Sequence, residues 1–238
     1  MIESLNNEKI KFAFKLKQKK YRQSTGLFLV EGEHLVEEAI KSNHAKQIFT
    51  TNMDTDYTVE TFVVSSEVMK KLSDLGESQG VIALCEKPDK HEWCDHVLIL
   101  DQIQDPGNMG TLIRSAAAFG FATIISEDSV DYYNQKVIRA SQGAIFYVDL
   151  LEMDISELIQ RHPEYHFIGT DVLMGLDLQD ADLSFDKLAI ILGNEGSGVG
   201  DEIKSLVNTN INIPMLSTES LNVGVAGGII MYEAFRRK

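Results

Sequence analysis

The chain has 238 residues, of which 44% are hydrophobic and only four are proline, and this composition excludes a disordered protein. No apolar run is long enough to cross a bilayer, and the lysine-rich first 20 residues lack the apolar centre of a secretion signal. We therefore expect a cytoplasmic protein that does not enter a membrane. The net charge of −14 is a poor fit to a protein that binds nucleic acid.

The first 22 residues are the exception to this acidic character. They carry seven Lys or Arg side chains against two Glu, a local charge of +5 that leaves −19 for the remainder. Three aromatic residues, Phe12, Phe14 and Tyr21, are interleaved with the lysines. A basic arm of this kind can hold phosphate groups while the acidic body stays soluble. The alternative interpretation is the solvated face of a helix.

From residue 26 onward, short apolar runs alternate with amphipathic stretches. The pattern predicts helices over 33–41 and 66–72, and strands over 27–30, 46–50, 62–64 and 80–85. A polar stretch that contains Pro88 follows at 86–90 and is typical of a linker. We therefore expect a small α/β domain over residues 1–90.

Beyond the linker, strand-like runs continue to alternate with helical patterns. The predicted strands are 97–100, 123–126, 146–150, 167–170, 188–192 and 210–213. Strands separated by helices imply a mostly parallel sheet, so a second α/β domain is expected over residues 91–238. Open sheets of this kind bind ligands beyond the carboxyl ends of their strands, which makes the following loops the candidate site.

Asn108 and Arg114 belong to the segment after the first of these strands. Residues 108–119 have a helical pattern, and Asn108 is the predicted N-cap. Asn108 and Arg114 flank the first turn, so both are expected to face a ligand. The apolar neighbours of Arg114 favour a partly buried arginine with a specific partner over a surface arginine.

Glycines mark two further segments. Residues 192–198 (Leu-Gly-Asn-Glu-Gly-Ser-Gly) follow a predicted strand, but no Lys-Ser/Thr follows them as it would in a phosphate-binding loop. The last predicted helix, 221–237, contains Gly224, Gly227 and Gly228, at a cost of about 3 kcal/mol relative to alanine. This cost indicates that backbone or a cofactor approaches the helix too closely for a Cβ atom.

The two cysteines, Cys85 and Cys94, suit a reducing compartment and give no disulfide framework. Cys94 lies close in sequence to His91 and His96, but the spacing matches no usual zinc pattern. We expect no metal site.

Three motifs follow one another in the second predicted domain. They are Asn108-x-Gly110-x-x-x-Arg114-x-Ala116, then Leu192-Gly193-x-Glu195-Gly196-x-Gly198, then Ile213-Pro214-Met215 with Ser220-Leu221-Asn222-Val223. Together they resemble the SpoU (TrmH) family of S-adenosylmethionine-dependent RNA 2′-O-ribose methyltransferases, within the SPOUT superfamily. Three ordered motifs make a specific match. The chain departs from the pattern at Leu216-Ser217, where many members carry glycine, and at Gly224, where serine is frequent.

The resemblance implies a fold and a chemistry. The fold is an α/β domain with a mostly parallel sheet and a deep trefoil knot, preceded by a smaller α/β RNA-binding domain. The reaction transfers a methyl group from S-adenosylmethionine to a ribose 2′-hydroxyl and needs no metal. The implied catalytic residues are Arg114, Asn108, Glu195 and Asn222. The implied cofactor-binding residues are Gly169, Thr170, Gly193, Ile213 and Leu221.

Roles and partners follow from the same resemblance. Arg114 is a poor base because it is fixed in its charged form, so it is expected to bind an RNA phosphate and polarise the hydroxyl. Phosphate or water then accepts the proton, and Glu195 is expected to orient Arg114 or Asn108, although a role as base stays open. A homodimer through the knotted domain and an rRNA substrate are implied. Two alternatives remain: the same chemistry on tRNA, and a knotted RNA-binding protein without catalysis.

Overall fold

The computed structural model describes residues 1–88 and 93–237. Within them the chain forms two compact units: residues 1–88 together with 133–147, and residues 93–132 together with 148–237. The first unit therefore includes a segment of the predicted second domain. The predicted boundary between residues 90 and 91 lies outside the described residues. No helix in the described chain is long and apolar enough to cross a membrane.

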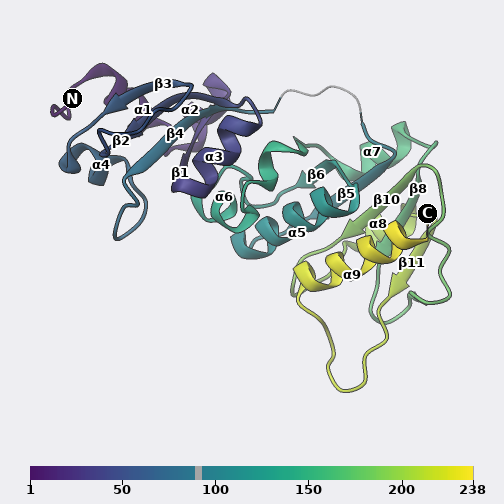
Figure 1. Ribbon diagram of the computed structural model, residues 1–238. Coiled ribbons are helices and arrows are strands. Elements are labelled where there is room, and N and C mark those ends of the chain that lie inside the picture. Colours follow the sequence, from purple (N-terminus) through teal and green to yellow (C-terminus); the bar gives the residue numbers. More distant parts are fainter. Residues whose placement is uncertain (89–92, 238) are drawn as a thin grey trace. The chain divides into compact units, whose positions relative to one another are not determined.

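A four-stranded mixed sheet forms the first unit, in the order β1-β4-β2-β3 (Figure 1). β4 pairs antiparallel with β1 and with β2, and β2 pairs parallel with β3. Each strand overlaps a predicted one. The strands span Leu27–Glu31 (β1), Ala45–Thr50 (β2), Glu60–Val63 (β3) and Val81–Glu86 (β4).

Helices α1 and α4 cover one face of this sheet, where Ile10 and Val68 share a buried cluster with Leu29, Phe49 and Leu84. Helix α3 contacts the same sheet through β1, β2 and β4. The helices span Glu8–Lys15 (α1), Lys19–Thr25 (α2), Glu33–Lys41 (α3) and Ser66–Leu72 (α4).

The basic N-terminal segment is a pair of packed helices, not an arm. Its residues Ile10, Ala13 and Leu16 are buried at helical spacing. Two of its cations hold the unit together: Lys17 lies 3.1 Å from Asp74, and the buried Arg22 donates to the carbonyl of Leu16 at 2.8 Å. Only part of the positive charge that was expected to bind RNA is therefore available at the surface.

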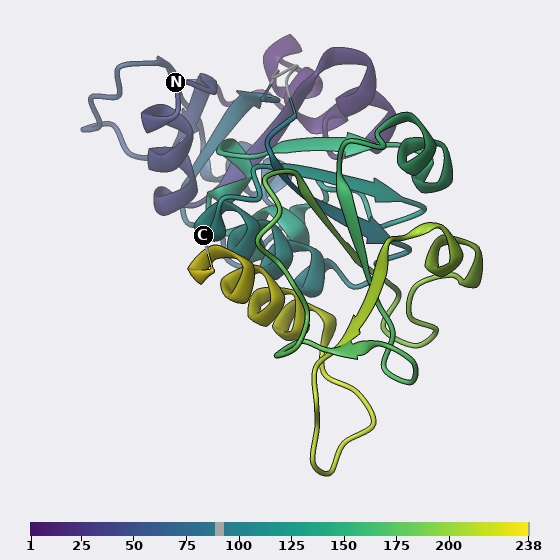
Figure 2. The same cartoon turned by 90° about the vertical axis from the view of Figure 1, so that its right-hand side faces the viewer.

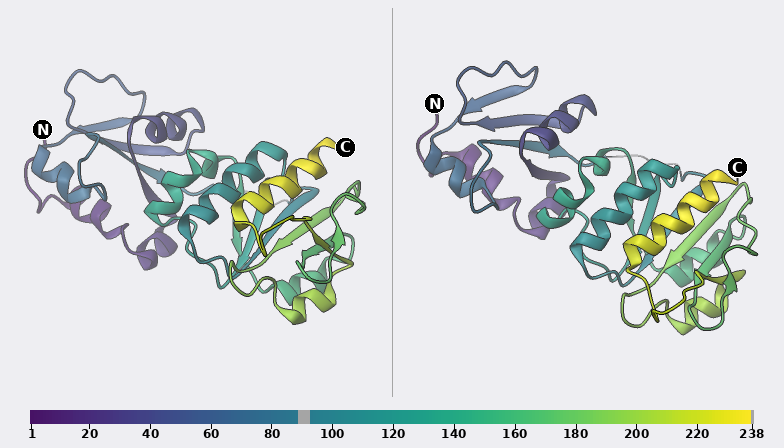
Figure 3. Two further views of the ribbon diagram at one scale, coloured as in Figure 1. Left: turned by 90° about the horizontal axis from the view of Figure 1, so that it is seen from below. Right: turned by 60° about the horizontal axis from the view of Figure 1, so that its bottom comes forward.

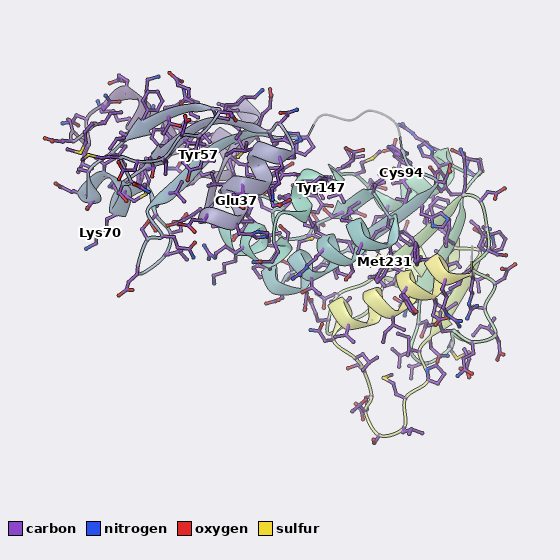
Figure 4. All side chains as sticks on the ribbon, in the orientation of Figure 1. Glu37, Tyr57, Lys70, Cys94, Tyr147 and Met231 are labelled. Carbon is purple, nitrogen blue, oxygen red and sulfur yellow. The ribbon has the colours of Figure 1, made fainter. Side chains whose placement is uncertain are left out.

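The segment 133–147 packs against the other face of the sheet. Phe28 alternates with Leu29 and so points to that face, where its ring centroid lies 4.7 Å from Tyr133 and 5.9 Å from Phe146. The hydroxyl of Tyr147, beside α3 in Figure 4, donates to Glu38 at 3.0 Å. The segment contains α6 (Gln135–Ser141) and the 3-10 turn η1 (Ala144–Phe146).

The strand predicted over 146–150 is therefore wrong at its start. β7 begins only at Asp149, and the apolar character of Phe146 reflects its burial in the first unit.

A seven-stranded sheet forms the second unit, in the order β7-β6-β5-β10-β8-β11-β9, and every pairing in it is parallel (Figure 2). The expected parallel sheet is confirmed. The sequence did not predict β9, because two residues are too few to show an alternation. The strands span His96–Asp101 (β5), Thr123–Glu127 (β6), Asp149–Glu152 (β7), His166–Thr170 (β8), Leu176–Asp177 (β9), Leu188–Leu192 (β10) and Thr209–Asn212 (β11).

Helices α5 and α9 lie side by side over one face of this sheet in all views (Figures 1, 2 and 3). Helices α7 and α8 cover the opposite face, where Leu158 and Ile203 share a buried cluster with Ile99 and Ile191. The helices span Pro106–Phe119 (α5), Ile155–Arg161 (α7), Asp201–Leu206 (α8) and Val223–Arg236 (α9).

Close packing beneath α9 explains two of its three glycines, Gly224 and Gly227, but not Gly228, where the nearest atom would lie 3.5 Å from a Cβ. A Cβ atom on Gly227 would overlap Leu112 and lie 2.6 Å from Cδ1 of Leu192, and one on Gly224 would lie 3.1 Å from Cγ2 of Thr111. The predicted close approach is thus real. It comes from side chains of α5 and β10, rather than from backbone or a cofactor as expected. The trefoil knot stays a prediction.

Candidate active site

The carboxyl ends of β5, β8, β10 and β11 lie at one edge of the sheet, because these strands run in the same direction. Gly169 and Thr170 end β8, Gly193 follows β10, and Ile213 follows β11. Leu221 lies in the loop between β11 and α9, which extends away from the sheet (Figure 2). The residues expected to bind a cofactor therefore come from segments that leave one edge of the sheet.

Asn222, Asn108 and Glu195 form a chain of hydrogen bonds at this edge. The amide of Asn222 donates to Oδ1 of Asn108 at 2.7 Å, and the amide of Asn108 donates to Oε1 of Glu195 at 2.9 Å. The backbone N–H of Asp105 donates to the same oxygen of Glu195 at 3.4 Å. Three of the four expected catalytic residues, from three distant segments, are thus in direct contact.

Asn108 lies inside α5 and does not cap it. The N-cap is Asp105, whose side chain accepts a hydrogen bond from the backbone N–H of Asn108 at 2.8 Å. The predicted cap was wrong because Pro106, which has no N–H to satisfy, fits the first turn, and the aspartate before it caps the helix. The side chain of Asn108 is therefore available to Asn222 and Glu195.

Asn222 is the N-cap of α9, and this role determines which way its amide points. Its Oδ1 accepts a hydrogen bond from the backbone N–H of Val225 at 3.2 Å, which leaves Nδ2 to donate to Asn108. The start of α9 therefore sets the direction of the whole polar chain.

The loop that carries Glu195 is held by the side chain of Asn194. Its Oδ1 accepts from the backbone N–H groups of Gly196 at 2.9 Å and Ser197 at 3.2 Å. Its Nδ2 donates to the carbonyl of Gln102 at 2.9 Å. These bonds tie the loop after β10 to the segment after β5.

Gly193 and Asp101 hold the two ends of this loop. A Cβ atom on Gly193 would overlap the backbone of Gly198 and Val199, so glycine is required here by the loop itself. At the other end, the backbone N–H of Gly200 donates to the buried Asp101 at 2.9 Å. A bulky substitution at Gly193 would consequently disturb the loop as well as any ligand.

The carboxyl group of Glu195 is ionised at neutral pH. Burial opposes its ionisation, but hydrogen bonds from Asn108 and from backbone N–H groups outweigh this, and the pKa of Glu195 lies below its ordinary value. A carboxylate with a lowered pKa is a weak proton acceptor. Its environment suits positioning better than general-base catalysis.

Arg114 does not join this polar chain. It is exposed on α5, and in the part of the chain that the structure describes it makes no hydrogen bond or ion pair. Six residues along a helix correspond to a rotation of about 240°, so Arg114 points about 120° away from Asn108. The expectation of a partly buried arginine with a partner is therefore wrong for the single chain.

Two residues that support the site, Asp105 and Asn194, were not predicted from the motifs. The Asp105-Pro106 pair is a recognisable start of a helix and identifies Asp105 as its cap. Asn194 has no comparable signal, because its partner Gln102 is 92 positions away.

The loop between β11 and α9 offers groups that suit an adenosyl cofactor. For residues 213–221, no backbone–backbone hydrogen bond is found within the described residues, so their N–H and C=O groups are open to a ligand. Ile213 and Met215 are half-buried, and Leu221 is exposed. Main-chain donors and acceptors beside apolar side chains are typical of such sites.

Neither cysteine belongs to this edge. Cys85 is buried in β4 of the first unit, where burial raises the pKa of its thiol, and Cys94 precedes β5. His91 lies outside the described residues. Within the described residues, no group of three or more His, Cys, Asp or Glu side chains could hold a metal ion.

Comparison with known proteins identifies relatives of the whole chain. Residues 95–232 match the SpoU rRNA Methylase family, and residues 7–83 match the MRM3-like substrate binding domain. The chain is 34% identical over 242 residues to the 23S rRNA (guanosine(2553)-2′-O)-methyltransferase RlmP of Bacillus subtilis, and the match covers 97% of each protein.

Solved structures agree with this comparison. The AdoMet-bound rRNA methyltransferase of Sinorhizobium meliloti is 25% identical with a TM-score of 0.86, covering 99% of this chain and 97% of that one. The crystal structure of an RNA 2′-O ribose methyltransferase is 28% identical with a TM-score of 0.80, covering 99% of this chain and 98% of that one.

Proposed function

Because this chain belongs to the SpoU rRNA methylase family, we propose that it transfers the methyl group of S-adenosylmethionine to a ribose 2′-hydroxyl of ribosomal RNA. The family and the relatives confirm the expected enzyme class. In the molecule itself, the proposal depends most on the polar chain of Asn222, Asn108 and Glu195 at the carboxyl edge of the sheet. An RNA-binding protein without catalysis does not require this arrangement.

One observation supports rRNA over tRNA as the substrate, and a second supports binding of an RNA substrate in general. The relative with 34% identity over nearly the whole chain is named for a guanosine of 23S rRNA. The first unit matches a substrate-binding domain model, so the chain carries a binding unit besides its catalytic one.

S-adenosylmethionine fits the edge formed by Gly169, Thr170, Gly193 and the loop 213–221. The main-chain groups of that loop would bind its polar atoms, and Ile213 and Leu221 would cover its apolar surface. Bound there, the cofactor supplies a methyl group on a positively charged sulfur, which needs no metal for its transfer.

The residues of the polar chain position the reactants and do not exchange protons. Asparagine side chains do not titrate, and the lowered pKa of Glu195 makes it a poor base. As the ribose oxygen bonds to the methyl carbon and the carbon–sulfur bond breaks, the hydroxyl proton goes to an RNA phosphate oxygen or to water. The guanidinium of Arg114 binds the adjacent phosphate through two N–H groups and polarises the hydroxyl.

A homodimer through α9 would place Arg114 of one protomer at the polar chain of the other. The outward side of α9 carries four apolar side chains that are 37–51% exposed, namely Val225, Ile229, Tyr232 and Phe235. An exposed row of this kind marks an interaction surface. Arg114 lies exposed in the same helical layer, and a second copy of the chain would cover the row and supply the arginine.

Transfer of a radiolabelled methyl group from S-adenosylmethionine to rRNA transcribed in vitro tests the reaction. We expect a nucleotide linkage that resists alkaline hydrolysis, with the Asn108→Ala variant as a control of strongly reduced activity. Methylation of tRNA but not rRNA would overturn the substrate assignment and leave the enzyme class intact. If the protein binds S-adenosylmethionine but methylates neither RNA, the proposed catalytic activity is wrong.

Mixed dimers test the shared site. Arg114→Ala and Asn108→Ala chains, each strongly impaired alone, should reach about a quarter of wild-type activity when co-expressed, since half of the dimers then carry one intact site. No recovery in a sample that forms mixed dimers would show that Arg114 acts within its own chain.

A further inference from the structure

Surface lysines concentrate on the first two helices of the first unit. Lys9, Lys11 and Lys15 lie on α1, and Lys19 and Lys20 begin α2. Outside residues 1–22 the chain carries a charge of −19. A polyanion such as RNA therefore meets least repulsion at this face.

Three aromatic rings accompany these lysines, and two of them are covered by a cation. Nζ of Lys71 lies 4.2 Å from the ring centroid of Phe14, and Nζ of Lys20 lies 4.8 Å from that of Tyr21. For Phe12, no ring or cation contact is found among the described residues, and 39% of its surface is exposed. Phe12 is thus the ring of this set that can stack on a ligand.

Phe12 lines a groove of about 440 Å³, which we call the Phe12 groove. Leu27 of β1 and Leu84 of β4 provide apolar surface in it, and its polar lining is Lys9, Lys46, Gln47 and one carboxylate, Glu8. The volume lies within the usual range for a small ligand, which is roughly 300–1,000 Å³. An aromatic ring, an apolar surface and ammonium groups in one groove suit the base and the phosphate of a nucleotide.

The lysines of the groove remain able to contact a phosphate. Nζ of Lys9 lies 3.7 Å from Glu60, and Nζ of Lys46 lies 2.5 Å from Glu86. All four side chains are between 44% and 55% exposed, and exposed pairs of this kind contribute little stability. An incoming phosphate can therefore share the ammonium groups at little cost.

On the basis of the proposed RNA substrate, we propose that the Phe12 groove binds one unstacked nucleotide of a single-stranded part of that RNA. The base stacks on Phe12 above Leu27 and Leu84, and its phosphate contacts Lys9. A peptide or a second copy of the chain would use the apolar surface, but it would not offer the lysines of α1 and α2 the polyanion that RNA offers.

Fluorescence of a short single-stranded RNA that contains one 2-aminopurine tests this site on the full-length protein. We expect quenching on binding, and Phe12→Ala should remove the quenching and weaken binding roughly 5- to 150-fold, as for the loss of one stacked base. Phe12→Trp should bind like the wild type. Phe12→Leu keeps the apolar volume without an aromatic face and should behave like Phe12→Ala. Met53→Ala, which removes a 70% exposed apolar side chain of the same unit, is the matched control.

Two results would overturn the Phe12 groove as an RNA site. Wild-type affinity and quenching in Phe12→Leu would show that an aromatic face is not used. A change in sedimentation of Phe12→Ala with unchanged RNA binding would assign the groove to a protein partner. In either case the wild-type protein still methylates RNA, whereas loss of the proposed function itself would appear as no methyl transfer by the wild type.

Discussion

The side-chain amide of Asn222 donates a hydrogen bond to Oδ1 of Asn108 at 2.7 Å, across 114 positions of sequence. The bond joins the starts of α9 and α5 at the carboxyl edge of the sheet. Asn108 in turn donates to Glu195 at 2.9 Å, so removal of one member costs its neighbour a hydrogen bond.

This arrangement predicts that Asn108 and Asn222 act as a unit. Single-turnover methyl transfer by Asn108→Ala and by Asn222→Ala should each fall about tenfold or more, and the double variant should be about as slow as the slower single one. The double-mutant cycle is measured with saturating RNA and cofactor. Multiplicative effects of the two substitutions would show that the hydrogen bond carries no coupling.

Arg114→Lys keeps the positive charge but loses the planar pair of donors. The rate of the chemical step should fall about 100-fold, as for a donor that acts in the transition state, while S-adenosylmethionine binding measured by calorimetry survives. Arg114→Ala should be as slow or slower. A near-wild-type rate for Arg114→Lys would overturn the proposed contact with phosphate and move the search to Glu195 or Asn222.

Gly227 and Gly228 form a matched pair for testing the contact between α5 and α9. Gly227→Ala should destabilise the protein by about 1–3 kcal/mol, because its Cβ would overlap Leu112 and crowd Leu192. At Gly228 the nearest atom, Oγ of Ser115, would lie 3.5 Å from a Cβ, so Gly228→Ala should stabilise by up to about 1 kcal/mol through helix propensity. Urea denaturation measures both, and equal effects would contradict the close packing.

The lowered pKa of Glu195 makes its contribution to stability depend on pH. Because the folded pKa lies below the unfolded one, the carboxylate stabilises the protein above the unfolded pKa, and this contribution is lost as pH falls through the folded pKa. Glu195 is exposed, so solvent screens its interactions, and Glu195→Gln should be less stable than the wild type by under about 1 kcal/mol at neutral pH, a difference that should narrow below about pH 4. Urea denaturation over a pH series measures this, with Glu219→Gln on the exposed loop as the control. A difference that is the same at every pH would assign the effect to shape, not charge.

Phe146 should stabilise the first unit although it lies within the sequence of the methylase family match. Phe146→Ala removes a ring that is 2% exposed and lies against Phe28, at a cost of about 3–5 kcal/mol. Trp93, the only tryptophan of the sequence, lies in the second unit. In the variant, circular dichroism should therefore show the first unit unfolding at a lower denaturant concentration than in the wild type. Trp93 fluorescence, which reports the second unit, should change at a higher concentration. Tyr147→Phe, which removes only the hydroxyl bond to Glu38, is the control. Coincident transitions at the wild-type midpoint would show that the segment is not part of that core.

The sequence by itself determined the elements and the order of the motifs. Helices over 33–41 and 66–72 and the strand over 188–192 lie where periodicity places them, since alternation of apolar residues is a local property. Asn108, Glu195 and Asn222 were identified by motif resemblance before any contact between them was visible.

Only the tertiary structure decided how these parts meet. Hydrogen bonds across 87 and 114 positions have no local signature, because in the isolated segments each side chain can hydrogen-bond to water equally well. The same holds for Gly227, whose missing Cβ is explained by Leu112 on another helix, and for Phe146, which is buried against a strand near the start of the chain. Arg114 is the reverse case, because its motif indicates a site residue. The sheet and α9 cover the other faces of α5, and the side chain of Arg114 is therefore left in solvent.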